Sequence, residues 1–431
     1  MKSNREYAEK LLDFINESPT AYHAVLTAEG MLKDNNFIEL KERDKWDITK
    51  GGKYYLKIND SAIFAFVVGE GEIEETGFKI IGAHTDSPGF KIKPRAEIIT
   101  EGRYVSLNTE VYGGPILNTW MDRPLSIAGR VTANSNGFLP KKYFINIKKP
   151  LLVIPNLAIH FNRRVNEGME INPQRHTLPL LTVGKERMKE GYLRKLLAKE
   201  LNIKEEEILD YDLFLYEYEK GSILGAEDEL ISSSRLDNLA MVHAALEALI
   251  HSSKSDAIKV AAFFDNEEVG SATRQGADSE VLTHLLERIV IALGKGREEL
   301  FRAYANSFMI SADLAHAVHP ILAEKYDPLN RAVINGGPVI KISAAQRYTS
   351  DSVTTAVFEM ICKRAGVPVQ KFVNRSDERG GSTIGPISST HLPIKSVDIG
   401  TPILAMHSIR ELGGVEDHGY VIKAFLEFYK K

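Results

Sequence analysis

The chain has 431 residues, a formal charge of −4, and apolar and charged contents of 43% and 26%, as in ordinary globular proteins. A chain of this length is too long to fold around one small hydrophobic core, so we expect two domains, or one domain with a large insertion. No run of Lys or Arg indicates a nucleic-acid or membrane-surface partner.

Cysteine content and apolar stretches bear on the cellular compartment. The single cysteine, Cys362, excludes an intramolecular disulfide, fits a reducing compartment, and lies in a helical pattern typical of a core residue. The first twenty residues read as an amphipathic helix without the apolar stretch of a secretion signal. No segment approaches the ~20 apolar residues of a membrane span. The sequence therefore predicts a cytoplasmic protein with no membrane partner.

Helices and buried strands alternate at both ends of the chain. In chain order, the predicted elements are helices at 5–16 and 21–34, strands at 61–68 and 78–84, a helix at 236–250, a strand at 257–264, a helix at 279–293, a strand at 307–312, a helix at 351–365, a strand at 396–399 and a helix at 419–430. Such alternation predicts an α/β fold with a mixed, largely parallel sheet and helices on both faces.

The middle of the chain has a different pattern. Residues 93–230 are rich in turns and short β-like pieces, with a charged helix near 183–200 and a strand near 212–218. We interpret this stretch as a β-rich domain inserted into a catalytic domain made of residues 1–92 and 231–431. The alternative is an extended sheet edge of the same domain.

Several predicted strands end in acidic or histidine residues. His84 ends one strand, and Asp86 lies two residues later, so both side chains can point to one side. Glu267 and Glu268 follow another strand, and Asp313 follows a third. An α/β sheet binds ligands at the carboxyl ends of its strands, so these groups are expected to meet.

Each of these motifs also has a structural interpretation. His84 can be a turn residue before Ser87-Pro88, Asp237 a helix cap, and His407 a satisfied core residue. The adjacent glutamates can be a solvated loop. Together, however, the motifs supply imidazoles, several carboxylates and a spare glutamate, which is the donor set of a two-metal hydrolytic site with its general base.

The motifs resemble those of the aspartyl aminopeptidase and aminopeptidase I family of cocatalytic metallo-aminopeptidases. The matching stretches are GAHTDSPGFKIKP (82–94), AIHFNRRVNEG (158–168), SSSRLDNL (232–239), FFDNEEVGS (263–271), SADLAHAVHP (311–320), GPVIKISAAQRY (337–348) and AMHSIRE (405–411). They span nearly the whole chain.

The resemblance implies a zinc-peptidase-like fold and two divalent metal ions per subunit, zinc foremost, with cobalt or manganese as alternatives. The implied ligands are His84, Asp237 and Asp313 for one metal, and Asp237, Glu268 and His407 for the other. It further implies that Glu267 is the general base, that Asp86 orients His84, and that the Asp237–Asn238 peptide bond is cis.

The resemblance also implies an assembly and a substrate. The insertion would be a dimerisation domain, and dimers would form a tetrahedral dodecamer in which His160 enters the neighbour's active site. Lys341 would pair with an acidic N-terminal residue of a peptide substrate. Ser343-Ala344-Ala345 departs from acid-preferring members, so a preference for neutral, leucine-like residues stays open. A dimetal amidase or deacylase on the same scaffold is one alternative. A non-catalytic metal-binding scaffold is another; it would lack the base or some ligands, and all of them are present in this sequence.

Overall fold

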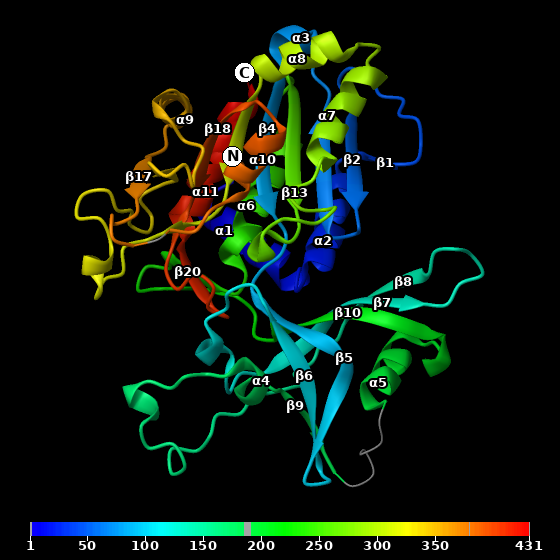
Figure 1. The fold of residues 1–431 in the computed structure, drawn as a ribbon. Helices are drawn as coiled ribbons and strands as arrows, with labels where there is room; N and C mark the ends of the chain where they lie inside the picture. Colours follow the sequence, from blue (N-terminus) through cyan, green and yellow to red (C-terminus); the bar gives the residue numbers. More distant parts are fainter. Residues whose placement is uncertain (1, 185–190, 379, 431) are drawn as a thin grey trace. The chain divides into compact units, whose positions relative to one another are not determined.

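The computed structural model describes residues 2–184, 191–378 and 380–430 (Figure 1). Contacts between residues divide the chain into two compact units. The first unit consists of Met1–Asp86, Gly221–Met406 and Glu411–Lys431. The second consists of Ser87–Lys220 and His407–Arg410.

The first unit is built around a nine-stranded sheet with the spatial order β1-β2-β3-β13-β4-β14-β18-β16-β17. In that order the strands are Ile38–Leu40, Lys53–Ile58, Ala62–Val67, Ile258–Phe264, Phe78–His84, Phe308–Ala312, Lys395–Gly400, Val339–Ile342 and Gln370–Val373. Five of the eight neighbouring pairs are parallel, and three are antiparallel. The predicted mixed, largely parallel sheet is confirmed.

Side chains alternate between the two faces of this sheet, and each face has its own hydrophobic core. On β13, Ala261 and Phe263 belong to one core, whereas Val260, Ala262 and Phe264 belong to the other. The first core includes side chains of α1 (Asn4–Glu17), α2 (Ala21–Asp34), α6 (Leu236–His251), α9 (Ser352–Ala365) and α11 (Val415–Lys430). The second includes those of α3 (Ile73–Thr76), α7 (Val281–Ala292), α8 (Arg297–Ala305) and α10 (Ile384–His391). Helices therefore cover both faces, as predicted.

Smaller elements complete the first unit. A three-stranded sheet has the order β11-β12-β20, and β15 pairs with β19. These strands are Ser222–Leu224, Leu230–Ser233, Glu411–Gly414, Ala315–His316 and Pro402–Ile403. Cys362 of α9 is fully buried, which confirms its predicted place in the core.

The second unit contains a six-stranded antiparallel sheet with the order β8-β7-β10-β5-β6-β9. The strands are Lys141–Asn146, Leu125–Ala133, Ile208–Glu217, Gly89–Thr100, Tyr104–Tyr112 and Leu180–Val183, and the helices are α4 (Pro173–His176) and α5 (Tyr192–Leu201). Leu193 and Leu197 of α5 pack in this unit's core. This part of the chain is therefore β-rich, as predicted.

The elements differ from prediction in several places; besides strands and helices that were not predicted, such as β2, β16, β17 and α10, two helices have other bounds than expected. The helix predicted at 183–200 begins at Tyr192; Val183 ends β9, and residues 185–190 lie outside the described residues. The last helix begins at Val415 rather than near 419. Helix α8 was not predicted: Gly294, with a φ of 79°, lets the chain turn between α7 and α8.

No helix within residues 2–184, 191–378 and 380–430 combines the length and apolar character needed to cross a membrane.

Two buried histidines join α6 to α11. His243 Nδ1 lies 2.9 Å from His418 Nε2, and the two rings stack with centroids 5.1 Å apart. Burial lowers the pKa of both imidazoles, that of His418 to about 3, and the charges of Lys2 and Lys10 act on His243 in the same direction. The folded protein therefore holds both rings neutral.

This histidine pair makes the stability of the fold depend on pH. An unfolded histidine takes up a proton near pH 6.5, whereas the folded pair resists it, so unfolding is favoured as pH falls below about 6.5. Below about pH 6.5, each histidine should lower the free energy of unfolding by up to about 1.4 kcal/mol per pH unit. Replacing both residues with Gln should remove this part of the slope. Urea unfolding between pH 7 and 5 measures that slope. His284→Gln, at an exposed position, is the control and should leave it unchanged, and an unchanged slope in the double variant would contradict this explanation.

Candidate metal centre

Acidic and histidine residues lie at the carboxyl ends of three neighbouring strands of the first unit, at one edge of the sheet. Strand β4 lies between β13 and β14 and is parallel to both. Figure 1 shows β4 beside β13. His84 is the last residue of β4, and Asp313 follows β14. Glu267 and Glu268 follow β13 in a short 3-10 turn. The carboxyl ends of parallel strands meet at one edge, so the backbone topology brings these groups together.

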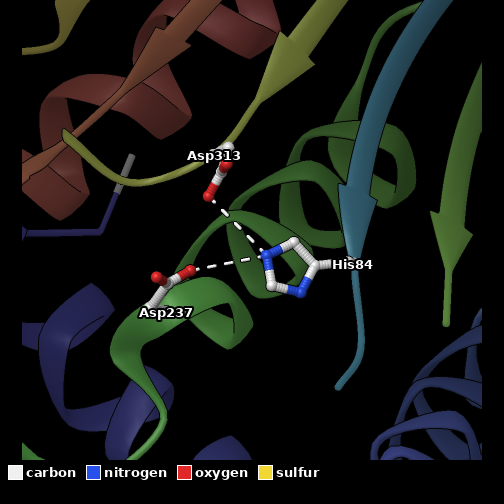
Figure 2. A group of neighbouring side chains, drawn as sticks. All are labelled: His84, Asp237 and Asp313. Atoms are coloured by element: carbon white, nitrogen blue, oxygen red, sulfur yellow. Dashed lines mark ion pairs between the residues drawn. The ribbon is translucent and has the colours of Figure 1, made fainter. Parts of the chain in front are cut away.

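The imidazole of His84 points one nitrogen at two carboxylates (Figure 2). Its Nε2 lies 3.4 Å from Asp237 Oδ1 and 3.6 Å from Asp313 Oδ1. All three side chains are buried, with His84 only 1% exposed. A neutral imidazole and carboxylate oxygens are common ligands of zinc, and these three offer ligand atoms within 4.8 Å of one another.

The opposite nitrogen of the same ring faces Asp86. His84 Nδ1 lies 3.1 Å from the Asp86 backbone oxygen and 3.3 Å from Asp86 Oδ1. A contact of this kind fixes which nitrogen of a histidine is free to face a metal. The sequence predicted that Asp86 and His84 would share one site, and the two residues are in direct contact.

Asp86 has a further function in the fold that the sequence did not indicate. Its carboxylate accepts hydrogen bonds from the backbone N–H groups of Glu267 (3.1 Å) and Glu268 (3.2 Å). Asn266, with a φ of 64°, makes the preceding backbone left-handed. One buried carboxylate therefore ties the end of β4 to the acidic turn after β13.

Asp237 lies at an irregular start of α6. The Asp237–Asn238 peptide bond is cis, as the resemblance predicted, and neither residue has helical backbone angles. The Asp237 N–H donates to Glu411 Oε2 (3.0 Å), and Asn238 Nδ2 donates to the Ala312 carbonyl (2.9 Å). Both Glu411 and Asn238 are buried. Both residues lie in the quoted motifs, but nothing in the sequence indicates that Glu411 bonds the Asp237 segment or that Asn238 bonds the segment after β14.

The glutamates of the acidic turn also lie near the imidazole. Glu267 and Glu268 form with His84 a second group whose ligand atoms lie within 4.8 Å of one another. Burial raises the pKa of Glu267 to about 8; His84 acts to lower it, and Asp313 and Asp237 raise it further. A carboxyl with a pKa near neutrality is suited to accepting and returning a proton.

A bound cation would offset the negative charge of these groups. Burial acts to lower the pKa of His84, but Asp237, Asp313 and Asp86 outweigh it and raise that pKa well above the ordinary value. Buried carboxylates at such distances repel one another, and a divalent cation among them favours their ionised forms. Both the donor types and their charge therefore fit a zinc centre.

The remaining predicted residues are Lys341, His407 and His160. Lys341 of β16 is buried in the first unit, with its Nζ 3.7 Å from Asp313 Oδ2. His407 belongs to the second unit, where its Nδ1 lies 3.1 Å from the Gly114 carbonyl oxygen. His160 also belongs to the second unit and is exposed.

The sequence profile of a family described as aminopeptidase I zinc metalloprotease (M18) matches residues 14–429. The chain belongs to this family. Membership agrees with the donor set around His84, and it confirms the family resemblance inferred from the motifs.

Individual relatives are similar over most or all of their length. A probable M18 family aminopeptidase 2 of Clostridium novyi (strain NT) is 62% identical over 431 residues, which is all of both chains. A solved structure of the Ape4 and Nbr1 complex contains a chain with 36% identity and a TM-score of 0.95, with 99% of this chain and 86% of that chain covered. The structure of the S. cerevisiae mApe1 dodecamer has 29% identity and a TM-score of 0.85, with 99% and 96% covered. The M18 fold therefore extends over nearly the entire chain.

Proposed function

We propose that this M18 chain hydrolyses the N-terminal peptide bond of peptides at a centre of two divalent metal ions, with zinc as the native metal. The observation that carries the proposal is the convergence of Asp237 and Asp313 on Nε2 of His84, beside the acidic turn. Cobalt and manganese accept the same donors, and availability decides among such metals.

The proposed ligands form two sets. His84, Asp237 and Asp313 would hold one metal, and Asp237, Glu268 and His407 the other, with the Asp237 carboxylate shared. The first set is supported by the short distances around His84. The second follows from the family resemblance.

The protein groups have separate tasks in the proposed reaction. A dizinc centre supplies a water of lowered pKa and polarises the scissile carbonyl. Glu267 takes the proton of the attacking water and returns it to the leaving amine; its raised pKa supports this task. Asp86 keeps the His84 ring in place and holds the backbone of Glu267 through one hydrogen bond.

The proposal also includes a substrate preference and an oligomeric assembly. An acidic N-terminal residue is the preferred substrate, with Lys341 as its cationic partner, and a neutral, leucine-like residue is the alternative. The second unit serves as a dimerisation domain of a homo-dodecamer, in which His160 reaches a neighbouring active site. Leu157, Ile159 and Phe161 around His160 are exposed, which supports an interface there because such side chains favour burial.

Removing the proposed base should stop turnover without removing metal. Glu267→Gln keeps the size of the side chain but cannot accept the proton, so kcat should fall by about 10²–10⁴-fold. Bound zinc, measured by elemental analysis, should stay at the level of the unmodified protein. Glu298→Gln changes an exposed glutamate of α8 and is the control. Normal turnover by Glu267→Gln would remove Glu267 from the mechanism.

A panel of substrates tests both which bond is cleaved and which N-terminal residue is preferred. Aminoacyl reporters of Asp, Glu, Leu, Lys and Ala, each with a free or an acetylated α-amine, are compared by kcat/KM with zinc, cobalt or manganese. Only free amines should be cleaved. A charged hydrogen bond of about 1.5–3 kcal/mol to the substrate would favour Asp and Glu about 10–100-fold over Leu.

The remaining outcomes of this panel lead to different functions. A preference for Leu or Ala would keep the aminopeptidase and overturn the acidic preference. Cleavage of acetylated reporters would indicate a deacylase or amidase. Metal binding without any cleavage would indicate a scaffold.

A further inference from the structure

The two carboxylate oxygens of Asp313 face different partners. Oδ1 lies 3.6 Å from His84 Nε2, on the side of the proposed metal. Oδ2 lies 3.7 Å from the ammonium nitrogen of Lys341. This division suits a carboxylate that binds a metal through one oxygen and is held in orientation by the other.

Lys341 contacts the backbone of the same turn. Its Nζ donates a hydrogen bond to the carbonyl oxygen of Leu314 (3.1 Å), the residue that follows Asp313. One ammonium group therefore contacts the side chain of Asp313 and the peptide next to it. The backbone N–H of Asp313, just beyond the end of β14, donates to the Ile399 carbonyl of β18, so the sheet holds its backbone and the Lys341 contact restricts its side chain.

Lys341 lies deep in the first unit. Its side chain is only 4% exposed, and the Tyr348 ring centroid lies 5.3 Å from Nζ. A buried ammonium requires neighbouring groups that compensate its charge, and the Asp313 carboxylate and the Leu314 carbonyl oxygen are such groups.

Lys341 adds a positive charge beside a cluster of carboxylates. Asp86, Asp237, Glu267, Glu268 and Asp313 all belong to this cluster. Divalent metal ions and the ammonium of Lys341 would both offset negative charge there and so limit the cost of burying these groups.

We propose that Lys341 is a positioning residue for the metal centre: it holds Oδ2 of Asp313 so that Oδ1 faces the metal shared with His84 and Asp237. This inference rests on the proposed metal centre. It differs from a role confined to pairing with an acidic substrate, because it makes Lys341 necessary for tight metal binding even when no peptide is present.

The test measures zinc affinity of the full-length, metal-stripped protein by competition with a chromogenic chelator. Lys341→Met removes the ammonium, and Lys341→Arg keeps the positive charge. Lys259→Met removes a lysine of β13 that is equally buried but contacts Ser252 and Ser253, so it controls for the loss of a buried lysine. Circular dichroism establishes that each variant is folded.

We expect Lys341→Met to weaken one of the two zinc equivalents by about 10–100-fold, which is the usual effect of losing a partner that orients a ligand. Lys341→Arg should keep more of the affinity, and Lys259→Met should match the unmodified protein. Unchanged or tighter zinc binding by Lys341→Met would overturn the proposal. So would a loss of acidic-substrate preference with zinc affinity intact.

Failure of the proposed function gives a different result. An unmodified protein that binds two zinc equivalents but cleaves no peptide would contradict the aminopeptidase proposal, while the zinc titration would still decide the role of Lys341. An unmodified protein that binds no zinc would overturn both.

Discussion

The first unit depends on one physical constraint: several carboxylates are buried around the imidazole of His84. Asp237 and Asp313 face its Nε2, Asp86 faces its Nδ1, and Glu267 lies close enough for these charges to affect its pKa. Negative charges at such distances in a protein interior are unfavourable unless cations or protons compensate them. The proposed ligand set, the proposed base and the position of the buried lysine all follow from the way this chain meets that constraint.

The sheet supplies the rigidity that such a cluster needs. Strand β4 lies inside the sheet, with hydrogen bonds to β13 and β14 on its two sides, and both faces of the sheet are packed with helices. His84 therefore extends from a strand that cannot shift without disrupting both cores. The groups on the adjoining turns are less constrained by the sheet, and there hydrogen bonds do the positioning: Asp86 to the acidic turn, Glu411 to Asp237, and Lys341 to Leu314.

Strand ends could be predicted from the sequence, and so could the residues that follow them. His84 and Asp313 each follow a short apolar run, and hydrophobic periodicity identifies such runs locally. The irregular start of α6 could not be derived from periodicity, because Asp237 also reads as an ordinary helix cap; the cis bond was expected only from the family resemblance. Partners distant in sequence, such as Asp86 with the amides of Glu267 and Glu268, were beyond local patterns because the fold alone brings them together.

The same distinction explains what the sequence indicated about Lys341. The family resemblance assigned this lysine of β16 to the substrate. Its contact with Asp313 depends on the order of strands, since β16 lies beside β18 and β18 beside β14. No local pattern could reveal that a lysine of β16 meets a carboxylate that follows β14.

Anomalous diffraction at the zinc edge, from crystals of the full-length protein grown with zinc, tests the central claim most directly. The proposed centre predicts two zinc peaks per chain, one of them about 2 Å from His84 Nε2 and from an oxygen of each of Asp237 and Asp313. A protein that shows no zinc peak within bonding distance of His84 Nε2 would contradict the account.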